Sequence, residues 1–322
     1  MAKKKSMKLI IQIPCFNEAD TLPATLADLP REVPGFDVVE YLIIDDGSTD
    51  DTIQVAKKHG VHHIRRFAAN RGLAAAFRAG LDKALALGAD VIVNTDGDNQ
   101  YPGGEIANLV RPITAGDADL VVGVRNIESI AHFSPLKKRL QRFGSTVVRW
   151  FSGLRVEDAT SGFRAFSRRA ALRLNVINRY TYTLETLIQA GRQNLAVATV
   201  PIKVNPKTRE SRLIRSTPLY IWRSALTTLR MFITYEPLRV LGSLAALLLG
   251  AGGLIGLRFL YFYYLADGGR GHVQSLILAA ILLIIGFQTG VLGVIADLSA
   301  TNRRLVEEVL MQSREQQRND DS

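Results

Sequence analysis

Cysteine is almost missing from this 322-residue chain, since Cys15 is the only one. A single thiol excludes a disulfide framework and any zinc site built from several cysteines. The five histidines show no spacing typical of metal ligands, so we interpret them as structural or surface residues. No glycine-rich segment ends in the Gly-Lys-Ser/Thr of a P-loop ATPase. Apolar residues make up 47% of the chain, which excludes a disordered protein.

Charge is missing from two long apolar runs near the C-terminus, Val240–Leu257 and Ser275–Ala296. Each run is long enough to cross a hydrocarbon core of ~30 Å as a helix, which needs roughly 20 residues. A buried core helix of a soluble protein would normally keep a polar stripe, and these runs have none. The aromatic cluster Phe259–Tyr264 is typical of a membrane interface. The sequence therefore predicts a two-span transmembrane hairpin.

Cations flank this hairpin but are scarce in its connector, where Arg270 is the one cation between residues 266 and 274. The positive-inside rule therefore predicts that both ends of the chain are cytoplasmic. The apolar stretch Leu9–Ile13 near the N-terminus is too short for a signal peptide and is interpreted as a strand. We expect a multi-pass protein of the inner (plasma) membrane with a cytoplasmic catalytic domain. The flanking arginines are Arg215, Arg223, Arg230, Arg239, Arg303, Arg304, Arg314 and Arg318.

Strand-like and helix-like segments alternate in the first part of the chain. This alternation predicts an α/β fold, a mostly parallel sheet with helices on both faces. The expected strands are Leu9–Ile13, Tyr41–Ile44, His63–Arg66, Val91–Asn94 and Leu120–Val124. The expected helices are Thr21–Leu29, Thr52–Lys58, Leu73–Leu87 and Gly104–Ile113.

Acidic turns follow these strands at the positions where parallel sheets bind ligands. Asp46 follows the second strand, and Asp96 and Asp98 follow the strand that begins at Val91. Three carboxylates gathered at one rim would repel one another unless a cation lay among them. Mg²⁺ or Mn²⁺ suits such oxygen ligands and would hold a diphosphate against them.

A resemblance to family-2 inverting glycosyltransferases of the GT-A fold rests on four segments, IPCFNEADTL, YLIIDDGSTDDT, NRGLAAAFRAGL and NTDGDNQYP. The strings VGVRN and DATSGFRAFSRRA are similar to the branch of dolichyl-phosphate mannose synthases and bacterial polyprenyl-phosphate glycosyltransferases. The resemblance covers about residues 8–215, and the two spans also match bacterial members of that branch. It implies transfer of a hexose from a nucleotide-diphosphate sugar (UDP- or GDP-hexose) to a polyprenyl phosphate such as undecaprenyl or dolichyl phosphate.

The same resemblance assigns roles to individual residues of the donor site. Asp96, Asp98 and Gln100 would hold the metal, and Asp98 is also a catalytic candidate acting through it. The residues expected to bind the nucleotide sugar are Pro14, Phe16, Asn17, Glu18, Asp46, Gly47, Ser48, Asn70, Arg71, Gly72, Asp96, Gly97 and Asp98.

Binding of a lipid phosphate requires cations. Arg125, at the end of a predicted strand, is the leading candidate for this contact and is also a predicted catalytic residue. Apolar residues at helical spacing predict a basic amphipathic helix over residues 134–152, which suits a membrane surface. A soluble helix with a solvated basic face is the alternative interpretation of that segment. The residues expected at the lipid phosphate are Arg125, Arg139, Arg142, Ser161, Lys207, Arg209 and Arg212.

The predicted organisation is a cytosolic GT-A domain at 1–215, a juxtamembrane amphipathic helix at 216–237, the hairpin at 238–297 and a cytosolic polar tail at 298–322. Glycines in both spans permit close helix packing, and a homo-oligomer is compatible with them. A processive polysaccharide synthase is the nearest alternative, but Arg149-Trp150 lacks the Gln of a Gln-x-x-Arg-Trp motif. A membrane transferase with another lipid acceptor, and a non-enzymatic nucleic-acid-binding module permitted by the +10 charge, are further alternatives.

Overall fold

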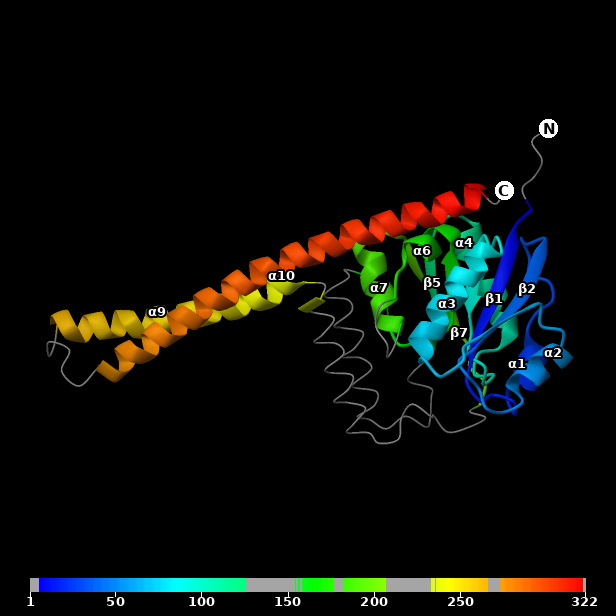
Figure 1. The fold of residues 1–322 in the computed structure, drawn as a ribbon, viewed down its shortest axis with the longest axis horizontal. Helices are drawn as coiled ribbons and strands as arrows, with labels where there is room; N and C mark the ends of the chain where they lie inside the picture. Colours follow the sequence, from blue (N-terminus) through cyan, green and yellow to red (C-terminus); the bar gives the residue numbers. More distant parts are fainter. Residues whose placement is uncertain are drawn as a thin grey trace. The chain divides into compact units, whose positions relative to one another are not determined.

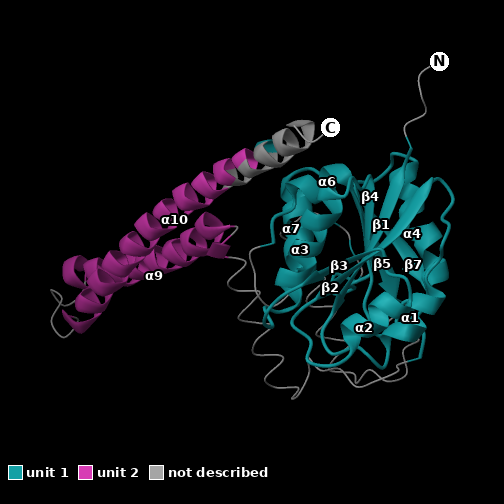
Figure 2. Cartoon of the chain, turned by 45° about the vertical axis from the view of Figure 1, so that its right-hand side comes forward, with its two compact units in different colours: residues 1–213, 311–322 teal, residues 214–310 magenta. Residues whose placement is uncertain are grey.

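The computed structural model describes residues 6–125, 154, 156, 158–176, 182–206, 233–234, 236–265 and 273–320. The chain divides into two compact units, residues 1–213 with 311–322 and residues 214–310 (Figure 2). The predicted amphipathic helix at 134–152 lies outside the described residues, as does most of the one at 216–237.

A seven-stranded sheet in the order β3-β2-β1-β4-β6-β5-β7 forms the centre of the first unit (Figure 1). Strand β6 is antiparallel to β4 and β5, and the other neighbouring pairs are parallel. The prediction of a mostly parallel sheet is therefore confirmed. The strands are β1 (Lys8–Cys15), β2 (Val38–Asp45), β3 (His63–Arg66), β4 (Val91–Asn94), β5 (Leu120–Arg125), β6 (Arg164–Ser167) and β7 (Val197–Ile202).

Helices cover both faces of this sheet (Figure 2). One face packs against α1 (Leu22–Asp28), α2 (Thr52–Lys58) and α4 (Ile106–Thr114), and the 3₁₀ turn η1 (Gly103–Glu105) directly precedes α4. The other packs against α3 (Leu73–Ala86), α6 (Arg168–Arg173) and α7 (Thr183–Arg192). Successive strand residues point to opposite faces, so Leu9 and Ile11 join the first core and Ile10 joins the second.

The second unit contains the long helix α9 (Pro237–Leu265) and residues 273–310 of the long helix α10 (Val273–Asp320). Both are long and apolar enough to cross a membrane, with mean hydropathies of 2.1 and 2.4 in their most apolar stretches. Only 11% and 17% of these stretches is buried, whereas the core helix of a soluble protein is mostly buried. The predicted spans Val240–Leu257 and Ser275–Ala296 lie inside the two helices, and α10 continues to Asp320 within the predicted polar tail.

Small residues line the contact between α9 and α10. A Cβ atom built on Gly286 would lie 2.9 Å from Leu249 Cγ and 3.0 Å from the Leu249 backbone nitrogen. Gly252 in α9 is similarly close, at 3.1 Å from the Ala279 carbonyl oxygen. The missing side chains therefore let the two backbones approach, which is how apolar helices associate without a hydrophobic driving force.

We expect Gly286→Ala to weaken the helix pair, while Gly253→Ala should not. The methyl group at 286 would push against the Leu249 backbone, at a cost of about 1–3 kcal/mol. Nothing lies within 4 Å of a Cβ at Gly253, so its replacement should be neutral or gain up to ~1 kcal/mol of helix propensity. Thermal unfolding of the full chain in detergent measures both. A Gly286→Ala protein at least as stable as Gly253→Ala would contradict this packing.

Candidate donor and acceptor site

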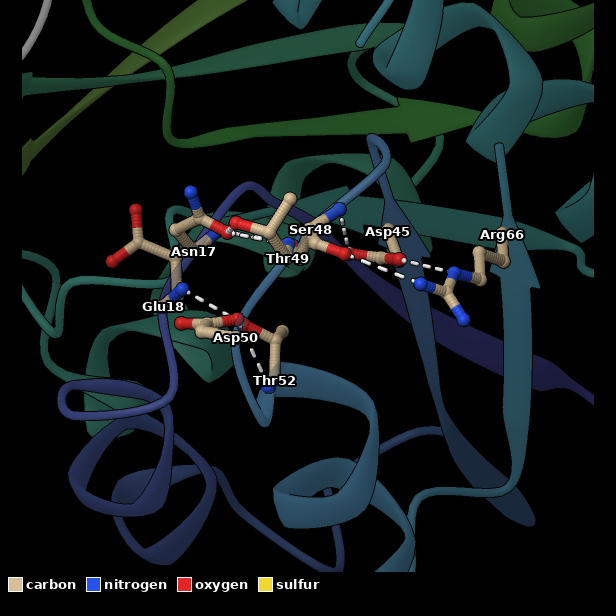
Figure 3. Close-up of polar contacts among 8 residues, drawn as sticks. All are labelled: Asn17, Glu18, Asp45, Ser48, Thr49, Asp50, Thr52 and Arg66. Carbon is tan, nitrogen blue, oxygen red and sulfur yellow. Dashed lines mark hydrogen bonds and ion pairs between the residues drawn. The ribbon is translucent and has the colours of Figure 1, made fainter. Parts of the chain in front are cut away.

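The turns after β1 and β2 are joined by reciprocal hydrogen bonds (Figure 3). The Asn17 backbone N–H donates to Ser48 Oγ at 2.9 Å, and the Thr49 N–H donates to Asn17 Oδ1 at 2.8 Å. Asn17 has a φ of +55°, a left-handed conformation that Asn tolerates better than most residues. Since the carboxyl ends of these parallel strands lie at one rim, the bonds fix the two turns against each other.

The carboxylates of Asp45 and Asp50 stabilise the turn after β2 by hydrogen bonds to nearby groups (Figure 3). Asp45 is fully buried; its Oδ1 accepts the Ser48 N–H at 3.1 Å, and its Oδ2 lies 3.3 Å from Arg66 Nε on β3. Asp50 accepts from the Ala19 N–H at 3.0 Å, and the Glu18 N–H donates to Thr52 Oγ1 at 2.9 Å. No role was predicted for Asp45 or Asp50 from the sequence. An acidic residue at the end of an apolar strand, such as Asp45, nevertheless indicates a carboxylate that needs hydrogen-bond partners within the fold.

Asp46 binds the loop that begins α3. Its two carboxylate oxygens accept the backbone N–H groups of Arg71 and Gly72 at 2.7 and 2.8 Å. Burial raises the pKa of Asp46 above its ordinary value, although these two N–H groups oppose the shift. Gly47 lies against the same loop at a φ of +75°, and a Cβ there would be 2.7 Å from the Ala69 carbonyl carbon. A side chain at this position has no room.

The turn after β4 contains Asp96, Gly97 and Asp98 and contacts the β1 turn. The hydroxyl groups of Thr21 and Thr25 donate to the Gly97 carbonyl oxygen at 2.9 and 3.0 Å. The Glu18 carboxylate, 2.8 Å from the Thr21 hydroxyl oxygen, is an alternative acceptor for the same proton. Gly97 is itself packed against Cys15 and Glu18, since a Cβ would lie 3.3 Å from the Cys15 sulfur. The acidic turns predicted from the sequence therefore do meet at one rim of the sheet.

Both candidate metal-ligating aspartates are partly exposed, whereas Gly97 between them is buried. Asp98 Oδ1 accepts the Gln100 backbone N–H at 3.2 Å, and Asn99 turns the chain with a φ of +54°. Among the described residues, no group of three or more His, Cys, Asp or Glu side chains is arranged to hold a metal by itself. This donor set fits a divalent cation that takes one or two carboxylates and completes its shell with phosphate oxygens and water.

Burial differs among the predicted nucleotide-binding residues. Phe16 is 37% exposed at the rim, whereas Glu18 is 7% exposed. Pro14 is buried within β1, beyond Gln12, the last residue of β1 that pairs with β4. Asn70 and Arg71 are exposed, with the Arg71 guanidinium 4.9 Å from the centre of the Phe67 ring.

Cys15 is 2% exposed, and burial keeps the pKa of its thiol well above the ordinary value, so the thiol stays protonated.

Arg125 at the end of β5 is buried and already bound to a carboxylate that sequence reasoning did not assign. Its Nε and Nη2 donate to the two oxygens of Asp158 at 2.6 and 3.0 Å, and Nη2 also donates to Thr160. Although burial opposes the charge, nearby Tyr101 and Asp158 raise the pKa of Arg125 above its ordinary value. Burial likewise opposes ionisation of Asp158, but the guanidinium outweighs it and lowers the pKa of that carboxyl.

Ser161 is fully buried, and its carbonyl oxygen accepts from Arg164 at 2.8 Å. Arg164 is also fully buried; its other donors bind the carbonyl oxygens of Ala159 and Thr183 and the hydroxyl of Thr186. Burial lowers the pKa of Arg164 to about 10, so it remains charged at neutral pH. The other predicted lipid-phosphate residues, Arg139, Arg142, Lys207, Arg209 and Arg212, lie outside the described residues.

The Arg125–Asp158 pair predicts a specific pH dependence. Its stabilisation is present above the pKa of an unfolded Asp, about 3.9, and is lost as pH falls through the lower folded pKa. We expect Asp158→Asn to be destabilised near neutral pH by about 3–5 kcal/mol, since it leaves a buried guanidinium unpaired. Its thermal midpoint should then decline less steeply than that of the wild type from about pH 5 to about pH 3.

Thermal unfolding across this pH range measures the effect. Asp117→Asn is the control, since Asp117 is exposed and precedes the amino end of β5, whereas Arg125 lies at its carboxyl end. It should keep the wild-type slope. Parallel curves for all three proteins would show that Asp158 carries none of the acid sensitivity.

Comparison with known proteins agrees with this geometry. The profile of Glycosyl transferase family 2 matches residues 10–174, which is just over half of the chain. The chain is 30% identical over 207 residues to undecaprenyl-phosphate mannosyltransferase of Micrococcus luteus, covering 61% of this chain and 83% of that protein. It is 31% identical over 213 residues to UDP-N-acetylglucosamine–dolichyl-phosphate N-acetylglucosaminyltransferase of Methanococcus voltae, covering 59% and 83%.

Among solved structures, a complex of glucosyl-3-phosphoglycerate synthase from Mycobacterium tuberculosis with Mn²⁺, UDP and phosphoglyceric acid is similar. The TM-score is 0.56 over 70% of this chain and 78% of that one, at 21% identity, which establishes a shared GT-A-like fold. The predicted resemblance to the polyprenyl-phosphate branch is confirmed by the named relatives. The chain belongs to glycosyl transferase family 2.

Proposed function

We propose that this protein transfers a hexose, with inversion, from a nucleotide-diphosphate sugar to a membrane polyprenyl phosphate, assisted by Mg²⁺ or Mn²⁺. The observation that supports this most directly is the joining of the turns after β1, β2 and β4 into one rim by hydrogen bonds. This rim includes Asp96 and Asp98 and the loop whose Arg71 and Gly72 N–H groups bind Asp46. Relatives named for transfer to undecaprenyl and dolichyl phosphate support the acceptor class.

The donor would lie across this rim. The nucleoside would contact the β1 and β2 turns near Phe16, Asn17 and Ser48, and the loop beginning at Asn70. Its diphosphate would reach the turn after β4, where Asp96, Asp98 and Gln100 would share a divalent cation with the phosphate oxygens. That cation, when bound, neutralises the charge that builds on the departing nucleoside diphosphate.

The reaction requires little proton transfer. An oxygen of the lipid phosphate attacks the anomeric carbon from the face opposite the diphosphate. The bond from that carbon to the diphosphate oxygen breaks, and its electron pair leaves with the nucleoside diphosphate. Because a phosphate monoester is ionised at neutral pH, no strong general base is required. Correct positioning and electrostatic stabilisation then account for most of the rate.

Arg125 would attract the acceptor phosphate to this rim. Asp158 and Thr160 hold its guanidinium in one orientation, and a cation fixed in this way loses little entropy when an anion binds. The arginine lies close to the proposed donor site, since the Asp96 carboxylate is among the groups that raise its pKa. Ser161 and the basic residues outside the described parts stay predicted contacts of the same phosphate.

The apolar helices α9 and α10 would hold the enzyme in the membrane that contains its lipid acceptor. Their length and composition support two spans, and the arginines beside them support a cytoplasmic catalytic domain.

The direct test incubates the purified full chain in detergent with Mn²⁺, undecaprenyl phosphate and single nucleotide sugars, including GDP-mannose, UDP-glucose and UDP-N-acetylglucosamine. Mass spectrometry of the lipid should show the gain of one sugar residue with at least one donor. Asp98→Ala should lower this yield by about 100-fold or more, because it removes an electrostatic contact that stabilises the leaving group.

Asp117→Ala is the matched control. It removes an exposed carboxylate beside the amino end of β5, away from the carboxyl ends of the strands, and it should keep wild-type activity. A sugar attached to another lipid or to a growing polysaccharide would reject the proposed acceptor. Full activity of Asp98→Ala with Mn²⁺ present would reject the proposed metal site.

We expect loss of Arg125 to affect the acceptor rather than the donor. Removing the arginine alone would leave Asp158 buried and unpaired, so the test uses the double variant Arg125→Ala/Asp158→Ala. The KM for undecaprenyl phosphate should rise about tenfold or more, which is ~1.4 kcal/mol or more of binding free energy. The dissociation constant of the nucleotide, measured by calorimetry, should stay within about twofold. A parallel loss of donor and acceptor binding would argue against this assignment.

A further inference from the structure

Gly162 lies directly behind the carboxylate of Asp96. It is buried in the DATSGFR segment just before β6, and a Cβ there would lie 3.3 Å from each of the two Asp96 carboxylate oxygens. The same Cβ would lie 3.0 Å from the hydroxyl oxygen of Tyr182. The carboxylate therefore rests against the α-carbon of Gly162, and its position depends on where this peptide is held.

Buried side chains hold the Gly162 peptide from both ends. Its N–H donates to the hydroxyl of Tyr101 at 3.3 Å. Its carbonyl oxygen accepts from Asn94 Nδ2 at 3.0 Å and from the hydroxyl of Tyr182 at 3.2 Å. Asn94 also donates to the Tyr182 oxygen at 2.9 Å, so these three groups close a triangle of hydrogen bonds.

The triangle is itself anchored to the core. Asn94 is the last residue of β4, fully buried, and its Oδ1 accepts from Gln12 of β1 at 2.9 Å. The Tyr182 ring stacks on Phe77 of α3, with centroids 3.8 Å apart and planes at 3°. Tyr182 is 1% exposed, and burial keeps its pKa well above the ordinary value, so its hydroxyl keeps the proton that it donates. Burying such polar groups in an apolar core costs folding free energy unless their hydrogen bonds are made.

We propose that Tyr182 is a positioning residue for Asp96, acting through Asn94 and the Gly162 peptide to set the carboxylate in the orientation that receives the cation and the donor diphosphate. This inference rests on the proposed function. Asn94 precedes Asp96 by two residues in the sequence, and Gly162 contacts Asp96 from the segment just before β6, so the triangle holds the chain on both sides of the carboxylate. Outer partners of this kind typically change metal affinity by 10–100-fold.

The test variant is Tyr182→Phe, which keeps the ring on Phe77 and removes only the hydroxyl. Tyr41→Phe is the matched control: Tyr41 is equally buried, at 1% exposed, and its hydroxyl bonds to Leu29 and Pro30 on the opposite face of the sheet. Calorimetry of the full chain in detergent measures the Mn²⁺ concentration that half-saturates binding of UDP or GDP, whichever the wild type binds. Tyr182→Phe should raise this concentration about tenfold, with the lipid KM unchanged, and Tyr41→Phe should leave it unchanged.

A second pair of variants separates positioning from stability. Gly162→Ala places a methyl group against both Asp96 and Tyr182, so it should lower the thermal midpoint and weaken Mn²⁺-dependent binding. Adding Tyr182→Phe removes the hydroxyl that the methyl group meets and should restore part of the thermal midpoint. It should not restore Mn²⁺-dependent binding, because the methyl group still presses on the Asp96 oxygens.

Wild-type Mn²⁺ dependence in both Tyr182→Phe and Gly162→Ala would overturn this inference and leave the proposed function standing. Recovery of Mn²⁺-dependent binding together with stability in the double variant would also overturn it, because the effect would then be structural. Donor binding by the wild type that needs no divalent cation would instead reject the metal in the proposed function, and this inference with it.

Discussion

Asp46 is buried directly after β2, and its two carboxylate oxygens accept backbone N–H groups from the loop that precedes α3. A carboxylate leaves water at a cost unless its oxygens are bonded, so this position demands the loop as a partner. Gly47 lets the loop approach closely, and Asn17 ties the β1 turn to the same place. The proposed donor side of the site is thus held in place because each buried carboxylate must have hydrogen-bond partners.

A second layer of buried polar groups lies beneath the turn that contains Asp96. Arg164 satisfies the carbonyl oxygens of residues 159, 161 and 183 and thereby fixes the segment that precedes β6 to the start of α7. Arg125 and Asp158 neutralise each other within the same segment. The buried Arg164 is bound by carbonyl and hydroxyl oxygens and adds positive charge to this segment, which suits a place where anionic phosphates would arrive.

The sequence predicted the strands and helices up to β5 closely, because these strands are apolar runs and these helices have apolar residues at helical spacing. His63–Arg66 and Val91–Asn94 match β3 and β4 as observed, and Thr52–Lys58 matches α2. Strands β6 and β7 and helices α6 and α7 were not predicted. The β6 sequence, RAFS, is short, contains a charge and runs antiparallel between strands distant in sequence, and β7 is interrupted by Pro201. The acidic turns could be predicted because each follows an apolar strand.

The partners of the site residues could not be predicted in the same way. The bond between Arg125 and Asp158 joins residues 33 positions apart, and that between Asn94 and Tyr182 joins residues 88 apart. Such pairs depend on the tertiary path of the chain. A weaker signal did exist, since Gln12 and Asn94 are polar residues inside otherwise apolar strands, which indicates a buried hydrogen-bond network.

The central claim is that loops from separate strands together hold the diphosphate of the donor through a cation at Asp96 and Asp98. Anomalous diffraction from crystals of the chain grown with Mn²⁺ and a nucleoside diphosphate tests it most directly. The account predicts a manganese peak at bonding distance, about 2.0–2.6 Å, from a carboxylate oxygen of Asp96 or Asp98, with the diphosphate on its other side. A nucleotide bound away from this rim, or manganese bound with no contact to either aspartate, would contradict it.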